Sequence, residues 1–424
     1  MKIFKHGHHR LFEADEETAK IVSDMLLDLE RNGMDAVRKY SSHFDNWSPE
    51  SFELSPQQID EAIAQVPEQI LDDTAYSQDN VRRFAEAQMT MFHDVELEVR
   101  PGAVLGHKHI PIRSLASYIP GGAYPLFGSA QMSIIPARVA GVENIYAFTP
   151  PVKGGTYYPA TINAMKQAGA DRIFILGGVP ALAMAAFGME DLQPVDMICG
   201  AGNKYIAEAK RQLFGRCGID LLAGPSEIAI IADGSVDPYI VAADILGQAE
   251  HDLNTGLILI CFDEDYAQRC VDEISWQLPK LGTRNIAEPA WNNNGQICIA
   301  ANREEAVALC DDWAPEHLEV LASAEEQQYY LEHLHNYGSL FLGEETTVAY
   351  GDKTIGTNHI LPTSRAARYT GGVWVGKFLK TVTYQRCTPA ASVEIGEVVL
   401  RQCLAENLPG HAKTAELRVD KYHQ

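Results

Sequence analysis

The sequence predicts an α/β protein with two doubly wound α/β domains, a helical N-terminal segment and a C-terminal helical tail. Three observations predict this fold. Between residues 114 and 214, strands run into glycine turns and then into helices. A second stretch of alternating strands and helices extends from about 219 to 342. Apolar residues recur at helical spacing near both ends of the chain. Strands that alternate with helices form parallel sheets covered by helices on both faces.

The first segment, residues 14–95, shows apolar residues three and four positions apart, which is typical of amphipathic helices. Ser55, in "SPQQIDEAI", is a good helix N-cap. From about residue 95 the pattern changes to the alternation of "DVELEVRPGAVLGHKHIPIRSLASY", which predicts strands.

Three strand–glycine–helix units follow, and two of them are "DRIFILGGVPALAMAAFGM" and "VDMICGAGNKYIAEAKRQLF". "NIYAFTPP" and "TYYPATINAMKQAGA" supply a further strand and helix. Ligands of such sheets bind at the carboxyl ends of the strands, where these glycines lie. A dinucleotide fingerprint needs GxGxxG, and "GAGNKY" contains only its first two glycines. Tight βα turns also use glycine for conformational reasons alone, so both explanations stay open.

The second stretch contains a helix that starts at Pro238, the strand "GLILICF" and further helices and strands up to "GSLFLG". "APEHLEV" predicts a helix that begins at Pro315, with Glu316 and His317 in its first turn. From about residue 375 the chain is expected to be helical again.

Composition limits the function. The chain of 424 residues has a net charge of −23, which repels phosphate backbones and argues against nucleic-acid binding. No apolar stretch approaches the length of a membrane span, and the N-terminus lacks an apolar signal region. The eight cysteines are scattered, which predicts reduced thiols in a cytoplasmic protein without membrane contact.

Several polar residues form candidate sites. Gln248 and His251 in "GQAEHD" are three apart on a predicted helix and so share a face. Asp352 and His359 frame the polar loop "GDKTIGTNHILPT", and His411 lies in "LPGHAK". Imidazole and carboxylate groups suit zinc, manganese or iron. "HGHHR", near the N-terminus, is a weaker metal candidate because no carboxylate accompanies it.

Seven segments occur in the order found in histidinol dehydrogenases: "YIPGG", "GPSE", "GQAEHD", "APEHLEV", "GSLFLG", "GTNHILPT" and "LPGHAK". The resemblance extends from about residue 15 to the end. It implies an intertwined homodimer in which each subunit has two Rossmann-like domains and the two subunits share their active sites. The expected organisation is an N-terminal arm (1–14), a first α/β domain (15–117 with 228–373), an NAD-binding domain (118–227) and a C-terminal dimerisation tail (374–424).

The resemblance also implies roles for individual residues. One Zn²⁺ per subunit is expected, and its four ligands are Gln248, His251, Asp352 and His411, the last from the other subunit. Glu316 and His317 correspond to the catalytic proton acceptors, with His317 as the base for the alcohol and Glu316 activating water. The residues that correspond to substrate contacts are Ser226, His359 and Glu406. NAD⁺ is the implied cofactor, and the corresponding positions are Tyr118, Asn203 and Pro180.

The family oxidises a primary alcohol to a carboxylate in two NAD⁺-dependent steps through an aldehyde. Pro180 replaces the glutamine of the family's "GGAQA", which predicts a local change in cofactor binding. "EETTVAYGDK" and "KTVTYQ" resemble a branch that includes the sulfopropanediol dehydrogenases. The expected substrate is therefore a small polar alcohol such as a sulfonated propanediol, and L-histidinol is the alternative. Arg365, Arg368 and Lys377 are available for an anionic head group, although surface lysines and arginines are often only solvated.

Two other classes of protein remain open. A binding protein without catalysis could keep this fold, but the intact Glu316 and His317 argue against it. A Rossmann dehydrogenase without metal is the other class, and chelation with no change in activity would favour it.

Overall fold

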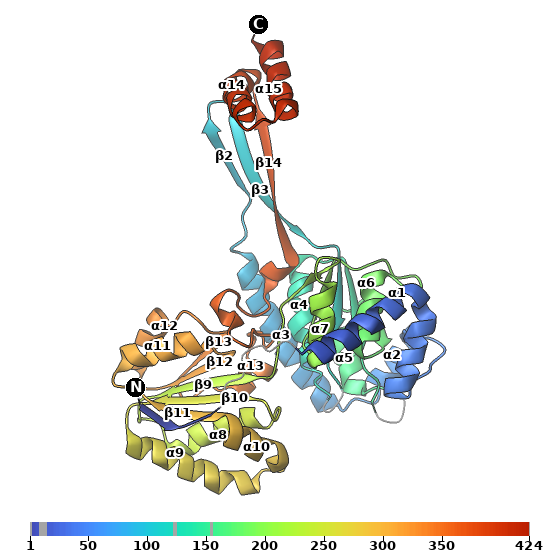
Figure 1. Cartoon of the computed structure of the whole chain (residues 1–424). Helices are drawn as coiled ribbons and strands as arrows, with labels where there is room; N and C mark the ends of the chain where they lie inside the picture. The colour runs from blue at the N-terminus through green and yellow to red at the C-terminus, as the bar shows by residue number, and fades with distance from the viewer. Residues whose placement is uncertain (1, 8–14, 122–124, 153–155, 424) are drawn as a thin grey trace.

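The computed structural model describes all residues except 1, 8–14, 122–124, 153–155 and 424. The chain forms two α/β bodies that lie side by side and a long arm that projects from them (Figure 1). His8 and His9 of the "HGHHR" segment, and part of the first glycine turn, lie outside the described residues.

The first body contains a five-stranded parallel sheet with strand order β6-β5-β4-β7-β8. Helices α4 and α5 cover one face, and α6 and α7 the other. The strands are β4 (Ser114–Tyr118), β5 (Asn144–Thr149), β6 (Arg172–Ile175), β7 (Met197–Cys199) and β8 (Gly218–Ile219). The helices are α4 (Ser129–Ala140), α5 (Pro159–Ala168), α6 (Gly178–Phe187) and α7 (Lys204–Leu213).

The N-terminal helices add an outer layer to this first body. Helix α1 packs on α6 and α7, α2 packs on α5, and α3 packs on α4. The domain division of residues 15–117 with 228–373 stays a prediction, and the packing places these three helices on the first body. Apolar side chains such as Val22 and Leu29 join the core of the first body, and sequence periodicity does not specify which sheet they cover. Their bounds are α1 (Glu16–Asp45), α2 (Pro56–Ile63) and α3 (Glu68–Met89).

The second body contains a six-stranded sheet with order β1-β11-β10-β9-β12-β13, in which only β1 is antiparallel to its neighbour. Helices α8, α9 and α10 cover one face, and α11 and α12 the other. The strands are β1 (Lys2–Lys5), β9 (Glu227–Ala232), β10 (Gly256–Cys261), β11 (Gly295–Ile299), β12 (His317–Leu321) and β13 (Ser339–Leu342). The helices are α8 (Pro238–Ala249), α9 (Glu264–Gln277), α10 (Arg284–Asn294), α11 (Arg303–Trp313), α12 (Ala324–His333) and α13 (Val348–Lys353).

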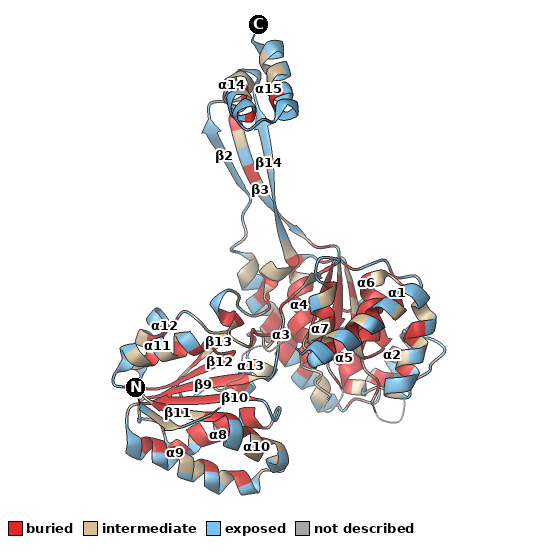
Figure 2. Cartoon of the chain, viewed as in Figure 1, coloured by how far each residue is buried: buried red, intermediate tan, exposed pale blue. Residues whose placement is uncertain are grey.

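The arm contains a three-stranded antiparallel sheet and a helical hairpin at its tip. Its elements are β2 (Val95–Arg100), β3 (Ala103–Pro111), β14 (Leu379–Cys387), α14 (Pro389–Ala405) and α15 (Pro409–Tyr422). Short 3₁₀ turns span Leu278–Lys280, Ala366–Arg368 and Val375–Phe378. The sheets of the two bodies are buried, whereas most of the arm is exposed (Figure 2).

Two of the predictions about secondary structure prove wrong in the strands β14 and β12. The chain after residue 375 does not turn helical at once, because Leu379–Cys387 first pairs along its whole length with β3. The prediction also placed a helix start at Pro315, whereas Glu316 lies in a turn and His317 begins a strand. Ala314 ends α11 in the left-handed conformation (φ 51°), and a residue before proline is disfavoured in the α region. Among the described residues, no helix is long and apolar enough to cross a membrane.

Candidate active site

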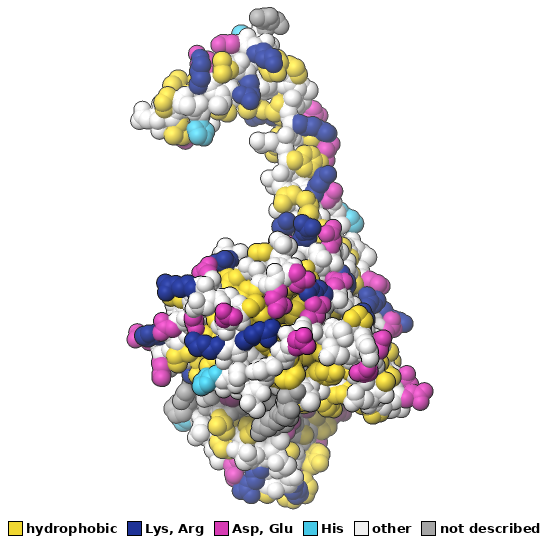
Figure 3. Space-filling model, turned by 90° about the vertical axis from the view of Figure 1, so that its right-hand side faces the viewer, with side chains coloured by type: hydrophobic (Ala, Val, Ile, Leu, Met, Phe, Trp, Pro, Cys, Tyr) yellow, Lys and Arg dark blue, Asp and Glu magenta, His cyan; other side chains and the backbone are white. Residues whose placement is uncertain are grey.

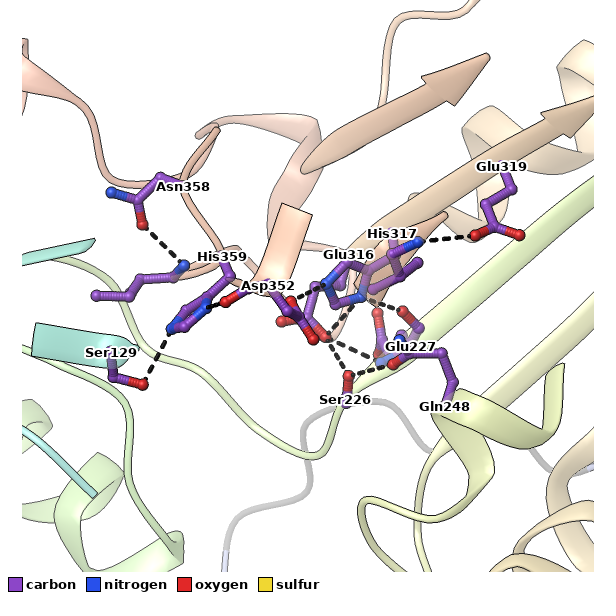
Figure 4. A network of polar contacts seen from close by, with 12 residues as sticks. Ser129, Ser226, Glu227, Gln248, Glu316, His317, Glu319, Asp352, Asn358 and His359 are labelled. Carbon is purple, nitrogen blue, oxygen red and sulfur yellow. Dashed lines mark hydrogen bonds and ion pairs between the residues drawn. The ribbon is translucent and has the colours of Figure 1, made fainter. Parts of the chain in front are cut away.

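The Glu316–His317 pair lies at the amino ends of two neighbouring strands of the second body, β9 and β12. β12 pairs with β9 in parallel, so the start of β12 lies beside the start of β9 and the "GPSE" turn before it. Carboxyl ends of parallel strands are the usual ligand sites. The pair therefore lies at the opposite end of the strands from the usual ligand site. Its partners come from the facing loops (Figure 4).

The peptide of Glu227 orients both members of the pair. Its N–H donates to Oε2 of Glu316 at 2.9 Å, and its carbonyl oxygen lies 2.9 Å from Nδ1 of His317. The hydroxyl of Ser226 also donates to Oε2 of Glu316 at 2.9 Å, and to Oε1 of Gln248 at 3.2 Å. One short turn thus holds the carboxylate, the imidazole and the amide together.

The tautomer of His317 follows from these contacts. A carbonyl oxygen only accepts hydrogen bonds, so Nδ1 carries the proton and Nε2 carries the lone pair. Nε2 is buried, has no hydrogen-bond partner in the described structure and lies 3.9 Å from Oδ1 of Asp352. Burial lowers the pKa of His317 below its ordinary value of 6.5, against the opposing effect of Asp352. The ring is therefore a neutral base with a free lone pair.

The pKa of Glu316 is shifted in the opposite direction from that of His317. Burial raises its pKa well above the ordinary 4.5, while the hydrogen bond from Glu227 N–H opposes the shift. Its Oε2 lies 3.5 Å from Nδ1 of His317. A carboxylate with a raised pKa is a stronger base, which suits proton transfer near neutral pH.

Two predicted metal ligands lie on or just after α8. Gln248 is buried in its last turn, but His251 lies two residues beyond its end and is exposed. The prediction had placed both residues on one helix. The N–H of His251 nevertheless donates to the carbonyl oxygen of Gln248 at 3.1 Å, so the chain stays tightly turned between them. Electrostatic effects of His251 on both His317 and His359 place it near the same site.

Asp352 approaches from the end of α13 and His359 from the polar loop that follows it, whereas the sequence predicted that both frame one loop. Nδ1 of His359 lies 2.9 Å from the carbonyl oxygen of Asp352, and Nε2 lies 3.0 Å from Oγ of Ser129 on α4. Removal of the His359 ring from solvent lowers its pKa. Asn358 donates to the carbonyl oxygen of Met132, also on α4, at 2.6 Å. The loop therefore ties the first body to the site on the second.

The predicted cofactor residues lie on the first body, around the point where its strand order reverses between β4 and β7. Tyr118 ends β4, and its hydroxyl accepts a hydrogen bond from the N–H of Gly178 at 3.2 Å. Burial raises the pKa of Tyr118 to about 12. Asn203 caps α7, whereas Pro180 is buried in the first turn of α6. These residues come from three βα turns at the sheet edge that doubly wound folds use for nucleotides.

A buried ion pair supports the third glycine turn. Nζ of Lys210 donates to the carbonyl oxygen of Gly200 at 2.9 Å, and the N–H of Gly200 donates to Asp220 at 2.9 Å. Lys210 also pairs with Asp220, and both side chains are almost fully buried. Gly200 has φ +135°, and a Cβ there would lie 2.1 Å from the main-chain oxygen of Tyr118. Only glycine fits this close approach.

His411 and Glu406 are not part of the site within one chain. His411 lies in α15 and Glu406 ends α14, and both are exposed at the tip of the arm. Figure 1 shows this tip far from β12. Within the described part of the chain, no three His, Cys, Asp or Glu side chains converge to hold a metal. One chain thus offers His251, Asp352 and the Gln248 amide, but not a closed set of four ligands.

Sequence reasoning missed several residues of the site. Glu227 and Ser129 act through contacts that a linear motif does not display, although Glu227 directly follows Ser226 in "GPSE". Lys210 resembles any helix lysine in sequence. Its burial against Asp220 depends on how α7 packs.

Comparisons with known proteins agree with this architecture. The family model described as histidinol dehydrogenase matches residues 9–419. A protein named histidinol dehydrogenase homolog from Shouchella clausii (strain KSM-K16) is 49% identical over 412 residues, covering 97% of this chain and 96% of that protein. Sulfopropanediol 3-dehydrogenase of Ruegeria pomeroyi is 43% identical over 408 residues, covering 96% of this chain and 93% of its own.

A solved structure is also similar to this chain over nearly its whole length. The crystal structure of histidinol dehydrogenase from Elizabethkingia anophelis matches with a TM-score of 0.92 at 31% identity, covering 98% of this chain and 95% of that chain. The fold and the matches define an oxidoreductase that acts on CH–OH groups. The chain belongs to the histidinol dehydrogenase family.

Proposed function

We propose that this protein is an NAD⁺- and Zn²⁺-dependent dehydrogenase that oxidises a small polar primary alcohol to its carboxylate through an aldehyde. The observation that carries the proposal is the buried Nε2 of His317, which holds a free lone pair 3.9 Å from Asp352. A neutral base beside a potential metal ligand is what removal of a hydroxyl proton requires. NAD⁺ supplies the hydride acceptor when bound, and zinc supplies a positive charge that holds the alcohol oxygen.

The donor set fits zinc. Gln248 offers an amide oxygen, His251 an imidazole and Asp352 a carboxylate, and zinc accepts nitrogen and oxygen ligands. Three ligands leave a four-coordinate site incomplete. We assign the fourth position to His411 of a second copy, because the arm carries this residue away from its own site.

The surface of the arm supports a homodimer. All six residues of β2 are exposed, and Val95, Leu97 and Val99 alternate along it, so they share one face. Leu97 lies opposite Leu105 of β3, which is also exposed. Hydrophobic side chains line the projecting arm (Figure 3). A small sheet with an uncovered apolar face gains stability from a partner.

The turns of the first body fit a dinucleotide. The N-terminus of α6 follows Gly177 and has no side-chain cap. Gly178 donates its N–H to the Tyr118 hydroxyl and Pro180 has no N–H, so Val179 is the first-turn residue whose N–H is left for a phosphate. The close backbone approach at Gly200 leaves the edge beside Tyr118 free of a Cβ. Pro180 lacks both the N–H and the polar side chain of the family's usual glutamine, so fewer hydrogen bonds reach the cofactor there.

In this mechanism His317 and Glu316 each accept a proton in one of the two oxidations. In the first oxidation, Nε2 of His317 accepts the hydroxyl proton while hydride leaves the carbon. In the second, Glu316 accepts a proton from the water that adds to the aldehyde, and the hydrate then loses hydride and a proton. Ser226, His359 and the Glu406 of a second copy are assigned to substrate binding.

The proposed substrate is a sulfonated propanediol rather than L-histidinol. Support comes from the relative named sulfopropanediol 3-dehydrogenase, which is 43% identical, whereas a relative named histidinol dehydrogenase, from Methanosarcina barkeri, is 37% identical. Arg365 is paired with Asp312 at 2.7 Å, and Lys377 donates to Thr370 at 2.9 Å. Arg368 uses its Nε to bind the carbonyl oxygen of Arg365. The three cations are therefore held in place by other residues, and within the described part of the chain neither Arg368 nor Lys377 forms an ion pair with a carboxylate.

The deciding experiment is NADH production with 2,3-dihydroxypropane-1-sulfonate and with L-histidinol, with the acid product measured. We expect turnover of the sulfonate with two NADH formed for each alcohol. Efficient turnover of L-histidinol at low concentration, with none of the sulfonate, would establish the alternative substrate.

A further inference from the structure

Two carboxyl groups that the proposed mechanism does not use face each other beneath the site. Asp244 lies on α8, and Glu319 lies on β12 and is fully buried. In the sheet register Glu319 stands between Ile230 of β9 and Phe341 of β13. A carboxyl group in such an apolar layer is costly when charged unless its oxygens are satisfied.

The hydrogen bonds of the two groups are incomplete. Oε1 of Glu319 accepts from the N–H of Val348 at 3.0 Å, and Oδ1 of Asp244 accepts from the hydroxyl of Thr347 at 3.0 Å. Oε2 of Glu319 is buried and has no hydrogen-bond donor in the described structure. The polar group that contacts Glu319 from α8 is the carboxyl of Asp244. Two carboxylates only accept hydrogen bonds, so they bond to each other only when one of them holds a proton.

Burial and mutual repulsion favour that proton. Burial raises the pKa of Asp244, and it raises the pKa of Glu319 well above the ordinary range, with the charge of Asp244 as the next cause. Two carboxyl groups in contact inside a protein commonly share one proton for this reason.

The pair connects the three elements that carry the proposed site. Helix α8 carries Gln248 one turn after Asp244, so the two share a face. Strand β12 carries His317 two residues before Glu319, on the same face of the sheet. Thr347 and Val348 begin α13, which carries Asp352.

We propose that Asp244 and Glu319 are positioning residues that share a single proton, and that their O–H···O bond holds α8, β12 and α13 at the spacing of the metal ligands and the base. The inference rests on the proposed function of those ligands. From α13 the pair meets the neutral Thr347 and a backbone N–H, and from the flanking strands it meets apolar side chains. The nearest titratable group on β12 itself is His317, and no lysine or arginine contacts the pair in the described structure.

Zinc affinity should depend on pH through the shared proton. When the shared proton is lost, two adjacent carboxylates repel each other and α8 moves away from β12 and α13. Zinc affinity then falls, because Gln248 and Asp352 lie on the elements that separate. Glu319→Gln replaces the shared proton with an amide N–H that donates to Asp244 at every pH.

The test uses the full chain and measures zinc affinity by competition with a chromophoric chelator from about pH 6 to pH 10. Hydrogen exchange of the α8 and α13 amides, in zinc-free protein over the same range, gives a readout that needs no catalysis. The variants are Glu319→Gln, Asp244→Asn and Glu319→Leu, and Asp265→Asn on the exposed side of α9 is the matched control. Thermal unfolding verifies that each variant folds.

We expect wild type and the Asp265→Asn control to lose zinc affinity at least tenfold toward the alkaline end, together with faster exchange of α13. Glu319→Gln and Asp244→Asn keep both properties to a pH at least one unit higher, and Glu319→Leu shows weak affinity and fast exchange throughout. An alkaline loss that is identical in wild type and both amide variants overturns the positioning pair. If Glu319→Leu does not fold, the two amide variants still decide the question. Absence of zinc binding in wild type at every pH contradicts the proposed metal site instead.

Discussion

Nδ1 of His317 lies 2.9 Å from the main-chain oxygen of Glu227, and this contact fixes which nitrogen of the ring keeps a free lone pair. The proton stays on Nδ1, so Nε2 faces the site with its lone pair. Glu227 also donates its N–H to Glu316, so the backbone of one residue orients both side chains.

The pH profile should show the effect of burial on His317. Burial lowers its pKa, and the neutral ring is the form that the proposed mechanism requires. The rate of the first oxidation is therefore kept as pH falls below 6.5 and is lost only as pH passes through the lowered pKa of His317, whereas the second oxidation also needs ionised Glu316, whose pKa is raised. The measurement is the rate of the first hydride transfer, followed as NADH in a single turnover, from about pH 5 to pH 9. An acid limb above 6.5 would contradict this assignment.

Replacement of the base tests its role directly. His317→Asn should lower kcat by about 10²–10⁴-fold, the range for loss of a general base, with NAD⁺ affinity unchanged. Steady-state kinetics and a fluorescence titration of NAD⁺ measure the two effects. His333→Asn is the matched control, because His333 lies exposed on α12. Unchanged turnover in His317→Asn would remove this residue from the mechanism.

Glu316→Gln should separate the two oxidations. The amide oxygen still accepts from Ser226 and from Glu227 N–H, so the local structure is kept, but the side chain no longer accepts a proton. We expect NADH per alcohol to fall from about two to about one, with accumulation of aldehyde or its hydrate. Trapping the aldehyde with a hydrazine reagent measures this, and the exposed Glu332→Gln serves as control. Two NADH per alcohol at the wild-type rate would exclude Glu316 as the water activator.

A site shared between two copies makes a prediction about mixed dimers. His251→Ala and His411→Ala should each be inactive alone. In a mixed dimer, one of the two sites receives an intact His251 and an intact His411 from different chains. Refolding the two variants together should therefore restore about a quarter of wild-type activity. No recovery, in dimers shown to be mixed, would place all ligands on one chain.

The Lys210–Asp220 pair predicts an effect on both stability and cofactor binding. Lys210→Met leaves Asp220 charged in the interior without its partner, which typically costs about 3–5 kcal/mol of unfolding free energy. It also frees the carbonyl oxygen of Gly200, so NAD⁺ binding should weaken. Urea unfolding and an NAD⁺ titration measure the two effects. Lys413→Met, which breaks an exposed pair with Glu416, should change little. A Lys210→Met protein as stable as this control would refute the argument.

The sequence was sufficient for the strand–glycine–helix units and for most elements of the second body. Periodicity and turn residues are local signals, and β4, α4, β6, α6, β7 and α7 follow them closely. The sequence was not sufficient for β11, because residues 284–299 show no clear periodic pattern of apolar side chains. It was also not sufficient for the pairing of β14 with β3. β14 pairs with a strand more than 260 positions earlier in the chain, and a local sequence pattern does not indicate which distant strand a segment pairs with.

The "APEHLEV" segment shows the same division. Its sequence determined that a proline interrupts the regular secondary structure there, and that a carboxyl group and an imidazole follow this proline. Whether the segment became a helix or a strand depended on β9 and β13, which flank His317–Leu321 on both sides and bury it.

The sequence by itself thus determined the types and order of most elements, the glycines at the turns and the chemical groups available for catalysis. The tertiary structure alone decided which nitrogen of His317 is free, that Lys210 is buried against Asp220, and that Asp244 meets Glu319. These properties depend on which faces are removed from water and which atoms become neighbours, and both are set by packing between elements far apart in the chain.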